Sequence, residues 1–280
     1  MRKAFLLVAL LVASSLALPA QPSVPRQASF AGQVIRFDRS DYYERMDREL
    51  LSFTYMHSNS ILTLKRSERY FHQIVPVLKK YGIPEDLKYL MAIESSMDPK
   101  AVSKTGAAGL WQFTKATAAT YGLEVTTEVD ERYNVEKETE AACKYLKKAY
   151  EKFGDWFTAA ASYNAGQAGI SRRLEEQHQK SALELWMTEE TSRYMFRLVA
   201  AKMMFENPSA FGFTVTERYP YYPPKEVVEV SGPIPSLVAF AEEHGVSYMA
   251  LKEANLWLRS DKLTNKGGKT YKIIIPASGR

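Results

Sequence analysis

The sequence predicts a mainly α-helical domain followed by a small βααβ module. Between residues 42 and 205, apolar side chains recur at three- and four-residue spacing, and sustained strand alternation is absent. Beyond a proline-rich stretch, the chain changes to short β-branched runs that flank two short helical patterns. A hydrophobic fraction of 46% with 25% charged residues excludes a largely disordered chain.

Residues 1–20 have the pattern of a secretory signal peptide. A short basic head precedes an apolar run that ends at Leu18, and small residues lead to Ala17 and Ala20, after either of which cleavage is expected. A membrane anchor is the alternative, but the run is short for a bilayer span. We therefore expect an exported protein with no stable membrane anchor after signal cleavage.

The remaining chain divides by composition into four further parts. Residues 21–40 are polar and predict a loose linker, and residues 41–205 predict the helical domain with an N-terminal helical extension. Residues 206–225 combine proline with aromatic side chains and predict a second linker. The helices expected within the helical domain are 42–54, 67–81, 84–96, 135–153, 156–163 and 191–205.

The pattern of residues 226–280, the C-terminal module, predicts one strand, two helices and a second strand, in that order. Val227–Val230 and Tyr271–Ile275 are rich in β-branched residues, as strands are. Helical patterns at 236–244 and 247–255 lie between them.

Composition also limits the ligand classes. The formal charge of +5 is only mildly basic, and no dense lysine and arginine stripe occurs, so we expect no nucleic-acid partner. Four histidines without metal-ligand spacing and a single cysteine predict neither a metal nor a cofactor. Cys143 falls on an apolar helical stripe and is expected to be a core residue.

Glu94 is the first candidate for chemistry. The helix that opens at Pro84 carries an apolar stripe through Leu87, Leu90 and Met91, and the next position on that stripe is Glu94. Burial there would raise the pKa of the carboxyl group and keep it protonated, as a general acid requires. The alternative is that Glu94 lies at the rim of the stripe and reaches water.

Four spaced motifs give the chain a recognisable pattern. The motifs, in chain order, are Glu94-Ser95, then Ser103 to Phe113 with Gly106-Ala107 and Gly109-Leu110-Trp111-Gln112-Phe113, then Tyr163-Asn164-Ala165-Gly166, and finally Glu190-Thr191 with Tyr194. Over roughly residues 65–205 the sequence resembles the soluble-lytic-transglycosylase-like domain, and most closely the membrane-bound lytic murein transglycosylase D group.

The resemblance implies a lysozyme-like fold, as in goose-type lysozymes and lytic transglycosylases. It also implies non-hydrolytic cleavage of the MurNAc–GlcNAc β-1,4 bond of peptidoglycan, which leaves 1,6-anhydro-MurNAc ends. Glu94 matches the catalytic glutamate, which acts first as an acid and then as a base. The substrate's own N-acetyl group assists, in place of a second carboxylate. Glycan strands are the implied partner and the periplasm the implied location.

Other positions carry over as substrate-binding residues. Ser103 matches a hydroxyl near the substrate N-acetyl group, and Tyr163 with Asn164 matches a pair that faces the acid. The remaining positions that the resemblance places in or beside the cleft are Ser95, Gln112, Phe113, Glu190 and Tyr194. A purely structural role is the alternative for Glu190, because an acid in the first turn of a helix interacts favourably with the helix dipole without any catalytic role.

The C-terminal module resembles a LysM domain, although Gly232-Pro233-Ile234-Pro235 replaces the usual turn after the first strand. The two prolines remove backbone donors that such a turn would offer, so glycan binding and mere packing on the helical domain both stay open. Two other functions also stay open for the whole chain. They are a hydrolase of the goose-type lysozyme kind, whose second acid would come from Glu124, Glu128 or Asp130, and a non-catalytic wall-binding protein.

Overall fold

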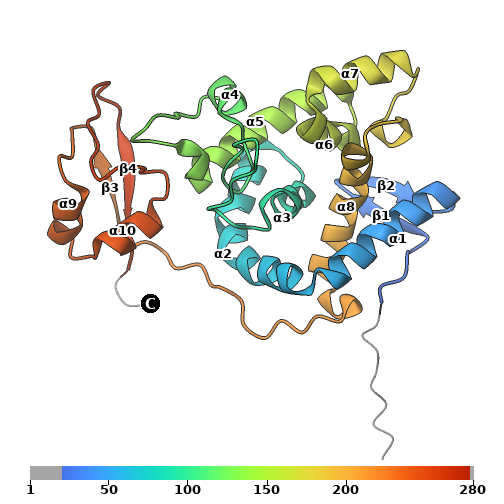
Figure 1. The fold of residues 1–280 in the computed structure, drawn as a ribbon, viewed down its shortest axis with the longest axis horizontal. Coiled ribbons are helices and arrows are strands. Elements are labelled where there is room, and N and C mark those ends of the chain that lie inside the picture. Colours follow the sequence, from blue (N-terminus) through green and yellow to red (C-terminus); the bar gives the residue numbers. More distant parts are fainter. Residues whose placement is uncertain (1–20, 278–280) are drawn as a thin grey trace, which may run out of the picture.

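The computed structural model describes residues 21–277, which form a helical domain and a smaller C-terminal βααβ domain (Figure 1). The expected signal peptide, residues 1–20, lies outside the described residues. The helical domain contains β1 (Gln27–Phe30), β2 (Gln33–Arg36), α1 (Ser40–Tyr55), α2 (His57–Tyr81), α3 (Leu90–Ser95), α4 (Lys115–Thr120), α5 (Val135–Phe153), α6 (Trp156–Ala165), α7 (Gln167–Glu176) and α8 (Glu189–Glu206). Short 3₁₀ helices occur at Glu85–Tyr89, Glu131–Tyr133, Ala182–Glu184 and Pro208–Phe211.

The short helix α3 lies in the middle of the helical domain. Helix α2 packs on α5, α5 packs on α6, and α8 contacts α1, α6 and α3. Trp111 and Phe196 are completely buried in the shared core, together with Leu90 of α3 itself. The core therefore holds α3 among longer helices (Figure 1).

The prediction of a mainly helical domain is confirmed, and each predicted helical segment is helical in large part. The structure adds two short helices, α4 and α7, that helical spacing does not predict. Among residues 21–277, no helix has the length and apolar character needed to cross a bilayer.

The prediction of a loose linker at residues 21–40 is wrong from Gln27 onward. Strands β1 and β2 form an antiparallel hairpin, and the turn between them places Ala31 and Gly32 at positive φ. Phe30, Ile35 and Phe37 are buried in the helical domain's core. The segment is polar on average, so its few apolar residues did not indicate a hairpin. Burial of these residues is enough to hold a short hairpin against the helices.

The second predicted linker, residues 206–225, begins with the 3₁₀ helix at Pro208–Phe211 and then runs extended along α2 (Figure 1). The amide of Tyr219 donates to the Lys65 carbonyl at 2.8 Å, and Arg218 donates to the Leu64 carbonyl at 2.9 Å. The connection between the two domains is therefore fastened to the helical domain.

The C-terminal domain consists of β3 (Glu226–Val230), α9 (Leu237–Glu243), α10 (Tyr248–Ala254) and β4 (Tyr271–Ile275). Strands β3 and β4 pair antiparallel, with Glu226 opposite Ile275. The buried side chain of Asn255 donates to the Ile274 carbonyl at 2.7 Å and accepts from the Ile274 amide at 2.8 Å, which ties the end of α10 to β4. The predicted βααβ order is confirmed.

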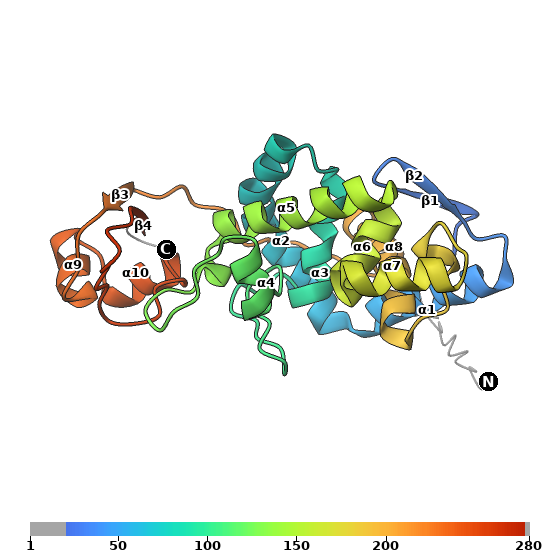
Figure 2. The same cartoon turned by 90° about the horizontal axis from the view of Figure 1, so that it is seen from above.

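The two domains share a small hydrophobic core. Val129 and Tyr133 of the helical domain pack in one buried cluster with residues of the C-terminal domain such as Leu258. The amide of Asp130 donates to the Trp257 carbonyl at 2.8 Å, so backbone also pairs across the junction. Figure 2 shows the loop before α5 reaching the C-terminal domain.

Candidate active site

Glu94 lies one residue before the end of α3, where the chain turns sharply. Ser96 and Met97 follow with φ of 52° and 56°, the left-handed region that stops the helix. Leu90 and Met91 on the same stripe are fully buried, as the sequence predicts, and Glu94 itself is half-buried. The carboxyl group therefore sits at the edge of the core.

Tyr194 on α8 contacts the Glu94 carboxyl group directly. Its phenol donates to Oε1 of Glu94 at 2.5 Å, and the tyrosine side chain is buried. Burial raises the pKa of Glu94 to about 7, and the nearby charge of Glu190 also raises it. The hydrogen bond from Tyr194 and the charge of Arg197 act in the opposite direction. The group is thus poised between acid and carboxylate at neutral pH.

Tyr163 on α6 is the second phenol of the site. Its hydroxyl donates to the Trp111 carbonyl at 2.8 Å, and its ring meets Phe113 edge to face with centroids 6.0 Å apart. Burial raises the pKa of Tyr163 well above its ordinary value, and the charge of Glu94 contributes to that rise. Tyr163 therefore keeps its proton and remains a hydrogen-bond donor within the site.

Asn164 connects α6 to the first turn of α8. Its Nδ2 donates to Glu190 at 3.4 Å, and its Oδ1 accepts from the Thr191 hydroxyl at 2.8 Å. Glu190 is exposed, and its charge influences Glu94. The negative charge of Glu190 thus raises the pKa of Glu94, in addition to any effect that it has on the helix dipole.

The segment that carries the glycines wraps around the end of α3. The Ser95 hydroxyl donates to the Leu110 carbonyl at 2.9 Å and so anchors this segment next to Glu94. Gln112 has φ of 52°, and its Nε2 donates to the carbonyls of Ala101 and Gly109 at 3.1 and 2.8 Å. Both side chains shape the backbone around the site.

Ser103 lies in the turn that opens this segment. Its hydroxyl accepts from the Ala107 amide at 3.0 Å and lies 3.0 Å from the Thr105 hydroxyl. The Ser103 side chain therefore stabilises the turn. Neither of these hydrogen bonds joins it to another predicted site residue.

Glu138 on α5 is a buried acid that the sequence reasoning did not single out. It is completely buried, and its Oε2 accepts from the Trp111 amide at 3.1 Å. Its Oε1 has no hydrogen-bond partner among the described residues, and burial raises the pKa of this carboxyl well above its usual range. An acid on a buried stripe, here with Ala142 and Leu146 at helical spacing, is the same signal that singled out Glu94.

An open hollow of about 620 Å³ lies between α4 and the junction of α6 with α7, and neither Glu94 nor Glu138 is among the residues that line it. Four of the predicted site residues line it, namely Gln112, Phe113, Tyr163 and Asn164. The hollow is rich in hydroxyl, amide and aromatic groups, which are the groups that bind sugars through hydrogen bonds and ring stacking.

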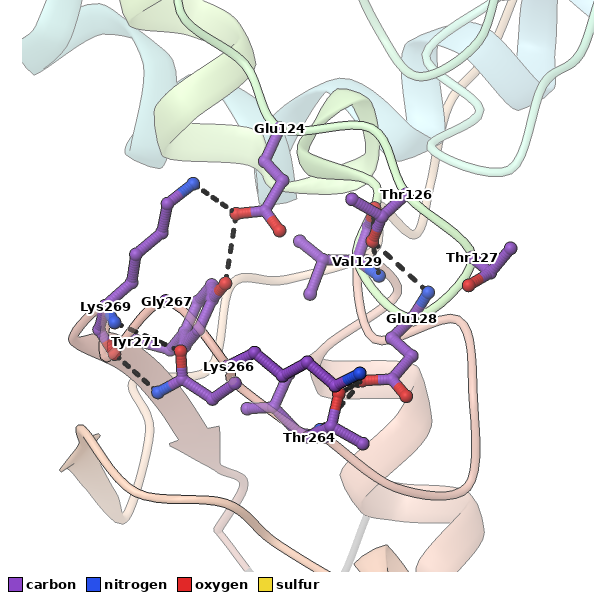
Figure 3. A pocket seen from close by; sticks show the side chains of 12 residues that line it. Glu124, Thr126, Thr127, Glu128, Val129, Thr264, Lys266, Gly267, Lys269 and Tyr271 are labelled. Carbon is purple, nitrogen blue, oxygen red and sulfur yellow. Dashed lines mark hydrogen bonds and ion pairs between the residues drawn. The ribbon is translucent and has the colours of Figure 1, made fainter.

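A second hollow, of about 430 Å³, opens between the two domains (Figure 3). Glu124 accepts there from Lys269 at 2.7 Å, and Glu128 accepts from the Thr264 amide at 2.7 Å. Asp130 is buried in an ion pair with Arg132. The three acids considered as a second, water-activating acid therefore have partners at the domain junction. None of them is among the groups that shift the pKa of Glu94.

Within residues 21–277, no group of three or more histidine, cysteine, aspartate or glutamate side chains is arranged to hold a metal ion. Cys143 is fully buried, as predicted, and burial raises the pKa of its thiol to about 12.

Two families match the chain. The Transglycosylase SLT domain matches residues 76–185, and the soluble lytic transglycosylase C-terminal LysM-like domain matches residues 226–279. Glu94, Gln112 and Asn164 fall inside the first range, whereas Glu190 and Tyr194 lie beyond it.

Curated relatives carry names of the same kind. Membrane-bound lytic murein transglycosylase D of Escherichia coli (strain K12) is 27% identical over 241 residues, which are 83% of this chain and 51% of that protein. The peptidoglycan transglycosylase gp16 of Escherichia phage T7 is 39% identical over 136 residues, which are 47% of this chain and 10% of that protein. The chain spans about half the length of the first of these relatives.

A solved structure of the lytic transglycosylase Slt of Pseudomonas aeruginosa is similar over 59% of this chain and 30% of that one, with 18% identity and a TM-score of 0.45. The family matches, rather than this likeness, identify both parts of the chain. The chain carries a transglycosylase SLT domain and a C-terminal LysM-like domain, and it is homologous to membrane-bound lytic murein transglycosylase D.

Proposed function

We propose that this protein is a peptidoglycan lytic transglycosylase with Glu94 as its catalytic group. The observation that carries the proposal is the half-buried Glu94 carboxyl, with its pKa raised to about 7 and a phenol donating to it, within a transglycosylase SLT domain. A carboxyl group of this kind serves as an acid and as a base at the same pH.

The proposed reaction uses one carboxyl group twice. Protonated Glu94 gives its proton to the glycosidic oxygen as the bond from C1 of MurNAc to that oxygen breaks, and GlcNAc leaves with a free hydroxyl. The substrate's N-acetyl group stabilises the anomeric carbon. The Glu94 carboxylate then takes the proton from the C6 hydroxyl as that oxygen bonds to C1. The product is a 1,6-anhydro-MurNAc end, no water is consumed, and Glu94 is protonated again.

The surrounding side chains support this cycle. The hydrogen bond from Tyr194 stabilises the carboxylate that exists between the two proton transfers. Tyr163 and Asn164 line the hollow in which a glycan strand would lie. Glu124, Glu128 and Asp130, the acids considered for water activation, are engaged with Lys269, Thr264 and Arg132 at the domain junction.

We further infer that the protein acts on glycan strands after export to the periplasm. The relatives' names refer to murein and peptidoglycan, and the apolar N-terminal segment 1–20 has the pattern of a secretory signal. Export is tested by expressing the full chain with a C-terminal tag and sequencing the mature N-terminus from the periplasmic fraction.

The reaction is tested by digesting purified peptidoglycan with residues 21–280 and identifying the new muramyl ends by mass spectrometry. Anhydro ends, lighter than reducing ends by one water, are the expected product. Reducing ends would make the protein a hydrolase instead. Glu94→Gln is the matched control, since it keeps the shape of the side chain without a transferable proton, and it should form neither product.

A further inference from the structure

Glu49 is a charged residue that neither family match covers and that the proposed mechanism does not use. It lies on α1 in the N-terminal extension and is completely buried. Its carboxylate accepts from Nε of Arg193 at 2.5 Å and from Nε of Arg197 at 3.1 Å. A carboxylate so buried is costly unless it is paired, and here two guanidinium groups pair with it.

The two arginines flank Tyr194 on α8. Arg193 precedes Tyr194 and Arg197 follows it by three residues, so all three belong to one turn of the helix. Arg193 and Arg197 are four residues apart and share the face that Glu49 contacts. From the same turn, Tyr194 reaches Glu94 at 2.5 Å. Figure 1 shows α1 beside α8, so the extension braces the helix that supplies this phenol.

The charges around the two carboxyl groups are connected through Arg197. Glu94 is faced by Tyr194, Glu190 and Arg197 from α8, and by Tyr163 from α6. Arg197 lowers the pKa of Glu94, and the same guanidinium donates to Glu49. Arg193 also interacts with the exposed Glu189, which in turn pairs with Arg48 of α1.

We propose that Glu49 is a positioning residue for the Glu94 carboxyl group. By binding Arg193 and Arg197 on the turn of α8 that carries Tyr194, it offsets the positive charge that Arg197 would otherwise direct at Glu94. This proposal rests on the proposed function, since it assigns the N-terminal extension a role in that reaction.

Two substitutions should shift the pKa of Glu94 in opposite directions. In Glu49→Gln the arginine charges are no longer balanced, so the pKa of Glu94 should fall. In Arg197→Gln a positive charge near Glu94 disappears, so its pKa should rise. Each change should be roughly 0.5 pH unit, the size that Coulomb's law gives for one partly screened charge. The double variant should return close to the wild-type value.

The decisive measurement is a carboxyl ¹³C NMR titration of protein labelled at glutamate, with Glu94→Gln assigning the Glu94 signal. Peptidoglycan turnover against pH supplies a second readout, and its alkaline limb should move with the titration. Arg39→Gln is the matched control, because Arg39 pairs with Glu184 on the surface and should leave both curves unchanged.

Opposite movements in the two variants would support the proposal. Movements in the same direction, or none, would overturn it, since a merely structural role lowers stability without reversing the sign. Where thermal unfolding shows that Glu49→Gln does not fold, Glu49→Asp replaces it, because the shorter side chain keeps the charge but draws it back from Arg197, so the pKa of Glu94 should again fall. A wild-type protein without turnover would defeat the proposed function and still leave the titration as a test of Glu49.

Discussion

The proton of Glu94 connects folding with chemistry at the scale of one residue. Burial raises the pKa of this carboxyl to about 7, so the folded chain holds the proton more tightly than the unfolded chain does. The folded state therefore loses stability as pH rises from the unfolded value, near 4.5, through about 7. At neutral to alkaline pH, the ionised Glu94 carboxylate therefore lowers the free energy of unfolding relative to the protonated acid.

Glu94→Gln should therefore stabilise the protein in a pH-dependent way. Relative to wild type, the gain should be small at acidic pH and grow to roughly 3 kcal/mol above neutral pH, since the amide never ionises. Urea unfolding at several pH values measures this difference. Glu136→Gln, a substitution at an exposed position, serves as the control and should show no such trend. An equal effect of Glu94→Gln at all pH values would contradict the raised pKa.

The hydrogen bond from Tyr194 makes a separate prediction for activity. Wild-type turnover should decline as pH rises above about 7, because the acid form of Glu94 is lost. Tyr194→Phe removes a donor that favours the carboxylate, so the alkaline limb should move to higher pH while the rate falls about tenfold or more. Rates measured on peptidoglycan from acidic to alkaline pH check both points. A wild-type rate that still climbs above about pH 9 would defeat the requirement for a protonated acid.

At the scale of elements, the site depends on how closely the Gly109–Gln112 segment approaches the 3₁₀ helix Glu131–Tyr133 and α5. Gly109 has φ of 84°, and a Cβ there would lie 1.8 Å from the Arg132 carbonyl oxygen and 2.4 Å from Glu138. Only glycine fits, because the neighbours are backbone and a fully buried side chain. The same approach lets Glu138 accept from the Trp111 amide.

Gly109→Ala should abolish folding or cost at least about 3 kcal/mol, since overpacking adds to the strain of positive φ. Gly106→Ala is the matched control, because Gly106 has φ of 80° and a Cβ added there would have nothing within 4 Å. It should cost only about 1 kcal/mol, from backbone strain alone. Chemical denaturation of both variants provides the comparison, and equal losses would show that the close contact of Gly109 with Arg132 and Glu138 is unimportant.

At the scale of the whole molecule, the LysM-like domain is joined to the helical domain by more than its linker. Val129 is 1% exposed in a cluster that contains Leu258 and Ile273 of the C-terminal domain. Lys100 and Glu253 add an ion pair at 2.6 Å across the same junction, although both side chains are exposed and such pairs contribute little. The buried apolar contacts are therefore what holds the two domains together.

Val129→Asp should separate the domains, because it places a charge in that shared cluster. We expect faster proteolysis within the connecting residues 212–225 and a melting transition that broadens or divides in two. Val238→Asp is the control, since Val238 on α9 is 43% exposed. Limited proteolysis with calorimetry measures both effects, and an unchanged cleavage rate in Val129→Asp would show that the junction is held by other contacts.

The long helices were predictable because each has one apolar face, and that pattern is local. The segments 135–153 and 156–163 coincide with or lie within α5 and α6. Helices α4 and α7 were missed because they are short and bury few residues, Ala118 in one and Ile170 in the other. The hairpin β1–β2 was missed because its stability comes from the core that it covers, which no local pattern reveals.

The sequence by itself determined the helical domain, the βααβ module and the choice of Glu94 as the candidate acid, because helical spacing and short motifs are local properties of a chain. The tertiary structure decided which groups meet Glu94. Tyr194 is distant from Glu94 in the sequence, and Glu49 acts through α8, so only the packing of α1, α3 and α8 connects the phenol with the two carboxyl groups. Protonation depends on burial and on neighbouring charges, and both arise only when the helices pack.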